Sequence, residues 1–363
     1  MEVIILQVIT VILVFAVLVI VHELGHFTVA KSLGIWVYEF SLGFGPAIWK
    51  RKKGETQYSV RAFPLGGFVS VAGMDEIADE EKGEVVPLER RYTSKPAWAK
   101  IATIAAGPLM NIVFAIVVSA IIVGVSGRLI PIVGKPMPGS SAEMVGLKGG
   151  DEIWAVDNLP IYNQGQFIQL IASSQDESIK LKVKREHEFL EFVVTPKFYE
   201  ELGRPIIGVD ELTYKEVPLG FFGVIKGGWD NTRIMVVTLF RGLRAMITGK
   251  VEADVAGPVG MVQMIGETAS VMEEDFLIGL LNVLYLAVFL SVNFAILNLL
   301  PVPVLDGGWI LLILIELIRG KPLTEKQKAI AQMTGLAFIA GLFLFATYSD
   351  FSRLGWLDNI LEK

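Results

Sequence analysis

Two histidines and a glutamate lie close together near the N-terminus, inside a stretch of apolar residues. The stretch reads LVIVHELGHFTVAK (residues 18–31) and contains His22, Glu23 and His26. Residues four apart lie on the same face of a helix, so both imidazoles would point to one side and could hold one metal ion. Glu23 would lie about 100° further round the helix, where it can take a proton from an attacking water. The pattern H-E-x-x-H is typical of zinc metalloproteases.

The surroundings of this motif favour a functional role. A chance match to three fixed residues would normally fall in a polar loop or in a solvated helix. Here the motif lies toward the end of an apolar segment, where ionisable residues are costly and usually functional. A structural pair of histidines with a buried glutamate partner is the alternative interpretation.

A third ligand is needed, because catalytic zinc sites have three protein ligands and an open position. The third histidine, His187, lies in the charged pattern VKREHEFLEF and is a poor candidate. Asp306, in LNLLPVPVLDGGWILL, is a better one, because it is the only acidic residue between Asp275 and Glu316. Prolines and glycines interrupt the helix around it, and such backbone at membrane depth is tolerated only inside protein or beside a wet cavity. Alternatively, Asp306 caps the helix that restarts at Gly307.

The composition indicates that these residues belong to a membrane protein. The chain has 363 residues, of which 53% are hydrophobic, and a mean hydropathy of +0.55. It is therefore too apolar for an ordinary soluble protein. A net charge of only −6 gives no sign of nucleic-acid binding. The chain has no cysteine, which excludes disulfides and thiolate chemistry.

Four apolar segments are long enough to cross a bilayer, which takes about 20 helical residues. The predicted transmembrane helices fall within residues 1–30, 98–125, 276–318 and 331–348, and NLLPVPVLDGG breaks the third. The first is too long for a cleaved signal peptide, and it lacks a basic start and a small-residue cleavage site. The predicted fold class is therefore a polytopic α-helical membrane protein with four transmembrane helices.

Basic residues predict the orientation of these helices. Lysine and arginine are frequent in residues 31–97 and 319–330, so both loops should be cytoplasmic. The termini, including the tail 349–363, and the segment between the second and third spans should then be outside. Within 213–275, which we expect to be a linker, residues 218–247 are apolar but carry five charges. We interpret them as an amphipathic helix at the outer interface; if they cross the membrane, there are five spans and the C-terminus is inside.

The loop after the first span is predicted to contain β-structure. Polar and apolar residues alternate over Gln57–Ala62, with Gly54 before them and proline and glycines after them. The preceding VYEFSLGFGPAIWK could pair with this run as a hairpin. The acidic stretch 75–95 reads as a solvated loop without chemistry.

The external segment 127–212 is predicted to be a separate domain. Its sequence predicts a short helix at Ser141–Val145 and a strand that begins at Glu152. The run IKLKVKREHEFLEFVVTPK has the alternation of two strands, and residues 203–212 are expected to form the closing strand. The pattern resembles a circularly permuted bacterial PDZ domain of α+β type.

Together these features resemble the site-2 proteases, the intramembrane zinc metalloproteases of family M50. The resemblance is strongest to the bacterial RseP/RasP-like branch, which cleaves anti-sigma factors and remnant signal peptides. It rests on the PDZ-like insert and on four motifs: HELGH (22–26), PLGGFV (64–69), GPLMN (107–111) and NLLPVPVLDGG (298–308). The better-known Gram-negative members carry two PDZ domains, whereas this chain has room for one.

The resemblance implies roles for individual residues. It implies that one zinc ion per chain is bound by His22, His26 and Asp306, and that Glu23 is the catalytic base. Four residues are implied to shape the substrate channel: Asn293, Asn298, Pro301 and Pro303. Asn111 matches a further family signature, which makes it a candidate support of the active site. The loop after the first span would form a small membrane-associated sheet beside the zinc.

The implied function is intramembrane zinc endopeptidase activity in regulated intramembrane proteolysis. Its partners would be pre-cut single-span membrane proteins and the lipid bilayer, and its location the bacterial cytoplasmic (inner) membrane. The external domain would either bind a peptide terminus or exclude bulky substrates. A non-catalytic PDZ-bearing scaffold or receptor is one alternative, and a metal transporter is another. Glu23 argues against both, because neither needs a base, and a transporter would need more metal ligands.

Overall fold

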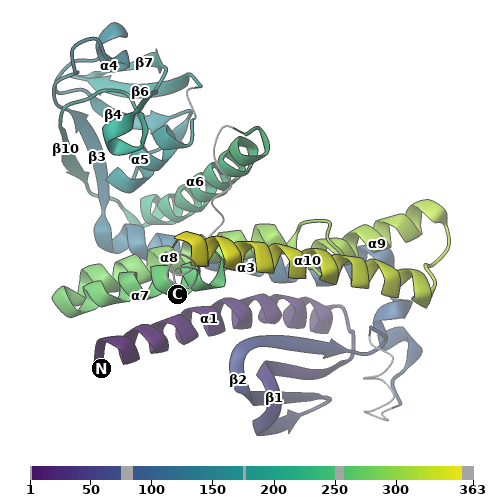
Figure 1. The fold of residues 1–363 in the computed structure, drawn as a ribbon. Helices are drawn as coiled ribbons and strands as arrows, with labels where there is room; N and C mark the ends of the chain where they lie inside the picture. Colours follow the sequence, from purple (N-terminus) through teal and green to yellow (C-terminus); the bar gives the residue numbers. More distant parts are fainter. Residues whose placement is uncertain (1, 75–84, 175–176, 250–256, 354–363) are drawn as a thin grey trace, which may run out of the picture. The chain divides into compact units, whose positions relative to one another are not determined.

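The computed structural model describes residues 2–74, 85–174, 177–249 and 257–353 (Figure 1). Among them, four helices are long and apolar enough to cross a membrane. These are α1 (Glu2–Ser32), α3 (Ala97–Ser126), α8 (Phe276–Asn298) and α10 (Glu325–Arg353). The four predicted apolar helices are therefore present, and residues 218–247 do not meet the same criterion. By contacts, the chain divides into residues 1–114 with 254–363, and residues 115–253.

In the first unit, α1 and α8 share an apolar core with α7 (Pro258–Glu274). The core contains Val14, Leu18, Ile265, Val283 and Leu286. The sequence had placed α7 in a linker. Proline at the first helical position is favourable, because its missing N–H would be unpaired there anyway. The α10 carboxylate of Asp350 accepts hydrogen bonds from the Gly257 and Gly260 amides, at 3.0 and 2.9 Å, and so ties the start of α7 to α10.

The third predicted span consists of two helices. The first is α8, which ends at Asn298, and the second is α9 (Asp306–Arg319), whose 14 residues are too few to cross a bilayer alone. Between them Val304 has φ 96°. A β-branched residue at positive φ is a genuine outlier, and such backbone costs roughly 1–3 kcal/mol. The strained turn changes the direction of the chain just before Asp306.

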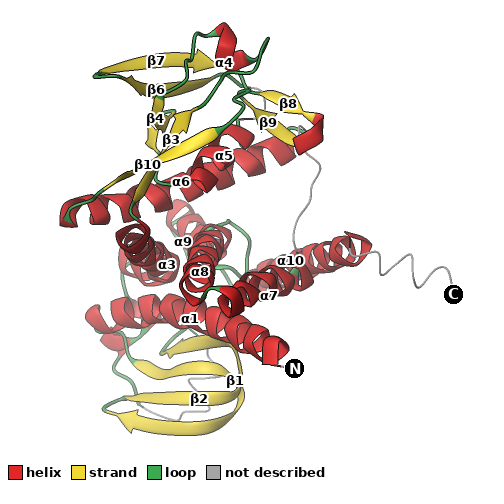
Figure 2. Ribbon diagram, turned by 90° about the vertical axis from the view of Figure 1, so that its left-hand side faces the viewer, coloured by secondary structure: helices red, strands yellow, loops and turns green. Residues whose placement is uncertain are grey.

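The predicted hairpin after α1 is present, as β1 (Val37–Lys53) and β2 (Thr56–Val71). Both strands are long and irregular in register, so each contributes two segments to the sheet. Residues 37–42 pair with 67–71 on one side and with 57–60 on the other, and residues 47–53 pair with 56–61. Residues 67–71 are thus one edge of a small curved sheet, which lies beside α1 (Figure 2).

Polar contacts fasten this sheet to the end of α1. The Glu55 carboxylate, at the turn between the strands, binds Lys31 of α1 and Arg90. Burial favours the neutral form of Glu55, but hydrogen bonds from Arg90 and Lys31 outweigh it and hold the pKa of the carboxyl below its ordinary value. The sheet therefore has a fixed position against the helix that carries the H-E-x-x-H motif.

The second unit contains a sheet domain, defined here as residues 128–217. Its strands are β3 (Arg128–Val133), β4 (Glu152–Val156), β5 (Leu159–Pro160), β6 (Ile179–Arg185), β7 (Glu188–Val194) and β10 (Leu212–Val217). The sheet order is β10-β3-β4-β6-β7, and β5 pairs with β4. Two helices, α4 (Ser141–Met144) and α5 (Gln164–Ala172), complete it. The buried core includes Ile153, Phe167, Leu170, Leu181 and Val183.

The single closing strand predicted at 203–212 is wrong. The chain forms β9 (Arg204–Ile206), which pairs with β8 (Lys197–Tyr199), and only then β10, which pairs with β3. The break lies at Gly208, whose φ is +83° and where a Cβ would lie 2.3 Å from the Ser140 Cβ. Only glycine fits this turn easily, although its apolar neighbours read as a strand.

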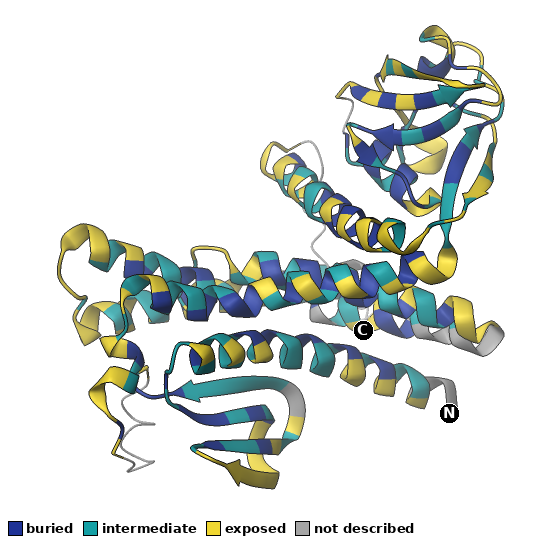
Figure 3. Ribbon diagram, turned by 180° about the vertical axis from the view of Figure 1, so that it is seen from behind, coloured by how far each residue is buried: buried dark blue, intermediate teal, exposed yellow. Residues whose placement is uncertain are grey.

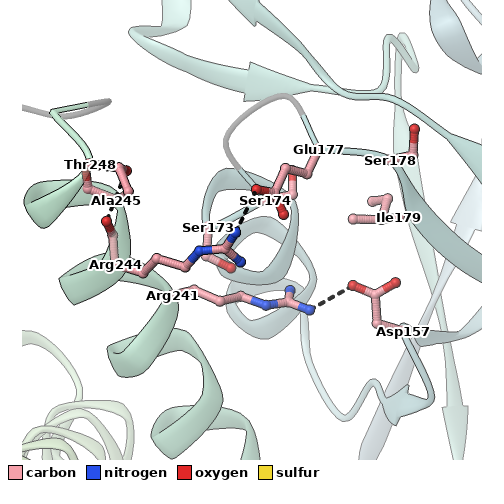
Figure 4. Close-up of a pocket in the computed structure, with 10 residues that line it drawn as sticks. All are labelled: Asp157, Ser173, Ser174, Glu177, Ser178, Ile179, Arg241, Arg244, Ala245 and Thr248. Atoms are coloured by element: carbon pink, nitrogen blue, oxygen red, sulfur yellow. Dashed lines mark hydrogen bonds and ion pairs between the residues drawn. The ribbon is translucent and has the colours of Figure 1, made fainter.

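Helix α6 (Phe221–Ile247) is part of the same unit. Ile234 is fully buried in the core of the sheet domain. The Tyr162 hydroxyl donates to Asp230 of α6 at 3.0 Å. Figure 4 shows a second link, in which Arg241 of α6 binds Asp157 at 2.7 Å beside a small polar pocket. The sequence had treated this helix as separate from the domain, but these contacts fix it there.

Figure 3 shows exposed and buried residues along α6. The exposed surface carries large apolar side chains together with charged ones, and the buried face is partly polar. The buried residues include Asp230, Asn231 and Thr232, and the exposed apolar residues are Phe221, Phe222, Ile225, Trp229, Phe240 and Ile247. An exposed row of aromatic and aliphatic side chains suits an apolar environment better than water. The helix therefore has the amphipathic character expected from the sequence.

Candidate metal centre

Three side chains from opposite ends of the chain converge at one point. His22 and His26 face the same way from α1, with their Nε2 atoms 3.1 Å apart. Asp306, the first residue of α9, places Oδ2 3.2 Å from His22 Nε2 and 3.6 Å from His26 Nε2. Among the described residues, these three form a group that could hold a metal ion.

The distances between the three atoms, 3.1, 3.2 and 3.6 Å, are close to those of a zinc site. Zinc binds nitrogen and oxygen at about 2.0–2.2 Å in a tetrahedral arrangement, so two ligand atoms lie about 3.3–3.6 Å apart. Asp306 Oδ2 is also buried and has no hydrogen-bond partner in the described part of the chain. A buried carboxylate oxygen without a donor is costly, and a cation between the three atoms would satisfy it. The residues present therefore fit zinc.

Two glycines shape the contact between α1 and α3. Gly25 allows the helices to approach closely, and Gly107 leaves space for the imidazoles. A Cβ at Gly25 would lie 2.2 Å from the Ala106 carbonyl oxygen, so the helix backbones nearly touch. A Cβ at Gly107 would lie 2.3 Å from His26 Nε2 and 2.9 Å from His22 Cε1. Both imidazoles therefore occupy the space that a side chain at position 107 would need.

Asp306 does not act as a helix cap. The N-cap position of α9 is Leu305, and no side chain forms a capping hydrogen bond there. The Asp306 carboxylate points toward the histidines instead. The capping interpretation of this residue is therefore wrong.

Glu23 lies beside the edge of the small sheet. The backbone of Val69 in β2 lies near its carboxylate. A Cβ at Gly67 would lie 3.3 Å from Glu23 Cγ, so β2 passes close to this side chain. Edge residues 67–71 therefore run directly alongside the H-E-x-x-H motif.

Four of the remaining predicted site residues lie near the C-terminal end of α8 or in the loop after it. Asn293 donates to the Phe289 carbonyl at 2.8 Å and Asn298 to the Phe294 carbonyl at 3.0 Å, both within their own helix. Pro301 is exposed and Pro303 is half-buried in the loop before Asp306. None of these four is a member of the converging group. Asn111, which is fully buried on α3, does reach it: its Nδ2 lies 3.3 Å from His22 Nδ1.

Three supporting groups were not found from the sequence. The Thr103 carbonyl accepts a hydrogen bond from His26 Nδ1 at 2.9 Å, and a backbone acceptor leaves no sequence signal. The Phe294 ring lies against His22, with centroids 5.0 Å apart, but this residue is one of many in an apolar run. Gly107 belongs to the GPLMN motif, so the sequence indicated that this position matters. The sequence did not indicate its steric role.

Comparisons with known proteins cover the whole site. The model of peptidase family M50 matches residues 10–342. The regulator of sigma-W protease RasP of Bacillus subtilis is 29% identical over 424 residues, which cover 96% of this chain and 98% of that protein. The zinc metalloprotease RasP of Bacillus licheniformis is 30% identical over 427 residues, covering 96% and 99%.

Part of the chain is similar to solved structures. One of them is the PDZ domain of an SdrC-like protein from Listeria monocytogenes, at 22% identity and a TM-score of 0.21, and the match covers 22% of this chain and 84% of that chain. A TM-score this low carries no argument about the fold of the sheet domain.

Proposed function

Since the chain belongs to peptidase family M50 and is a zinc metalloprotease, we propose that it cuts single-span membrane proteins within or near the bilayer. The observation that carries this proposal is the convergence of His22, His26 and Asp306 among helices apolar enough to span a membrane. The substrates we assign are anti-sigma-factor-like proteins or remnant signal peptides, already shortened by another protease. The name of the Bacillus subtilis relative, a regulator of sigma-W protease, supports the first class.

In this proposal His22, His26 and Asp306 hold the ion. Zinc held by these residues would supply Lewis acidity, for polarising the scissile carbonyl and making water more acidic. Glu23 takes the proton of the attacking water and delivers it to the leaving nitrogen. Strand β2, which passes close to Glu23 at Gly67, restricts the position of the carboxylate while it does so.

The small sheet supplies partners for the substrate backbone. A helical substrate must be unwound before its scissile bond can be reached, and lipid offers no hydrogen bonds to the freed groups. We assign this role to edge 67–71, along which an extended segment can add as a further strand. The amides of Asn293 and Asn298, with Pro301 and Pro303, would shape the opposite side of the channel.

The proposal is tested with purified protein in lipid vesicles and a trimmed single-span substrate. Wild type should hold about one zinc per chain and cut the substrate, and chelation should stop cleavage until zinc is restored. A substrate with helix-breaking residues near the scissile bond should be cut faster than one with an uninterrupted helix. His22→Ala should lose both zinc and cleavage, whereas the exposed His187→Ala should keep both. Cleavage that persists in His22→Ala would contradict the proposal.

We further propose a bacterial cytoplasmic membrane location, with both termini and a PDZ-like domain at 127–212 outside. The basic residues in loops 31–97 and 319–330 support this orientation. Because the chain has no cysteine, single engineered thiols report cleanly. In intact cells an impermeant reagent should label Ser178→Cys and Glu362→Cys but not Ser94→Cys. Labelling at Ser94, or protection at Ser178, would reverse the orientation, and protection at Glu362 alone would indicate a fifth span.

A further inference from the structure

The two histidines of the metal centre differ in what holds their far nitrogen. Both present Nε2 to the point of convergence, so Nδ1 of each faces away from it. His26 Nδ1 lies 2.9 Å from the Thr103 carbonyl oxygen, which can only accept, so this nitrogen carries the proton. His22 Nδ1 instead faces the side-chain amide of Asn111, with the amide nitrogen at 3.3 Å.

That arrangement conflicts with metal binding. A neutral imidazole that binds metal through Nε2 carries its proton on Nδ1 and needs an acceptor there. An amide N–H opposite that proton would place two donors face to face. The Asn111 Oδ1 atom, which could accept the proton, is meanwhile buried without a partner in the described part of the chain.

We propose that Asn111 presents Oδ1 to His22 and accepts the His22 Nδ1 proton when zinc is bound. The oxygen and nitrogen of an amide have nearly the same shape, and hydrogen bonding decides their assignment. The NH₂ group then lies on the side where Oδ1 has no partner in the described part of the chain, so that side of the amide loses no hydrogen bond. Asn111 is therefore a positioning residue that fixes the tautomer and the ring direction of His22.

Neighbouring helices hold Asn111 and His22 in place for this contact. Asn111 is fully buried, and its backbone carbonyl accepts a hydrogen bond from Ser291 of α8 at 2.9 Å. Phe294, one turn further along α8, lies against the His22 ring. The imidazole is thus in contact with Asn111 of α3 and with the Phe294 ring of α8. Loss of such a partner typically lowers metal affinity 10–100-fold.

The inference rests on the proposed metal site, and its test separates the two. Zinc affinity is measured by competition with a chelator, together with the visible spectrum of the Co²⁺-loaded protein. Asn111→Leu, which has a similar volume and no acceptor, should weaken zinc binding about 10–100-fold. Asn111→Asp, which accepts but cannot donate, should bind zinc at least as tightly as wild type and keep the Co²⁺ spectrum. The exposed His187→Ala, in the sheet domain, should change neither.

Equal losses in the Leu and Asp variants would overturn the inference, because Asn111 would then act as a donor or as packing. Unchanged zinc affinity in a folded Leu variant would overturn it as well. If the Leu variant does not fold, the Asp variant alone decides. The metal site itself is judged by His22→Ala: if this variant loses the zinc that wild type holds, the site stands whatever the Asn111 variants show.

Discussion

Glu23→Gln is expected to keep its zinc and to lose cleavage of the trimmed substrate by about 10²–10⁴-fold or more. A neutral amide cannot take the proton of the attacking water, so the loss should appear in the chemical step. The three converging atoms belong to other residues, so metal binding should persist. The measurement is single-turnover cleavage in vesicles, with the zinc content of the same samples.

A matched control makes this result specific. Glu325→Gln makes the same chemical change on an exposed side chain at the start of α10 and should leave cleavage unchanged. Near-wild-type turnover in Glu23→Gln would show that another group accepts the proton. Loss of zinc in that variant would instead indicate that Glu23 is a ligand.

Asp306→Ala is expected to lose both zinc and cleavage. The carboxylate supplies one of three converging ligand atoms, and two histidines alone do not make a catalytic site. Its loss should therefore remove most of the zinc. The free energy of unfolding should change little. Zinc content after dialysis against a weak chelator, measured beside thermal unfolding, distinguishes these two effects.

The control for this prediction is an aspartate that does cap a helix. Asp275 accepts a hydrogen bond from the Ile278 amide at 3.0 Å at the start of α8. Asp275→Ala should reduce the free energy of unfolding by about 1 kcal/mol and keep its zinc. If a folded Asp306→Ala variant retained full zinc occupancy, Asp306 would not be a ligand.

The three converging residues could be singled out from the sequence because each of them departs from its surroundings. His22 and His26 stand out in an apolar segment, and Asp306 is an isolated acid in a stretch broken by proline. Placing a polar or charged side chain inside a bilayer costs free energy, so such residues usually have a function. The four apolar helices could be predicted for the same physical reason, since length and hydropathy alone decide whether a helix can span.

Other features could not be predicted, because they depend on neighbours far away in the chain. The backbone carbonyl of Thr103 is an acceptor in any sequence, and only the approach of α1 to α3 gives it a histidine to bind. The break at Gly208 depends on contact with Ser140, about 70 residues earlier. Helix α6 reads as an interfacial helix from its composition, but its burial in the core through Ile234 depends on the sheet domain.

The distance in sequence between the two histidines and Asp306 bears on when a newly made chain can complete the converging group. Asp306 follows the histidines by roughly 280 positions, so at a synthesis rate of 5–20 residues per second it emerges roughly 15–60 s after them. If these residues act as proposed, the nascent chain carries the base and two of its three ligands during that interval. A chain that stalled or was cut before Asp306 would then remain inert.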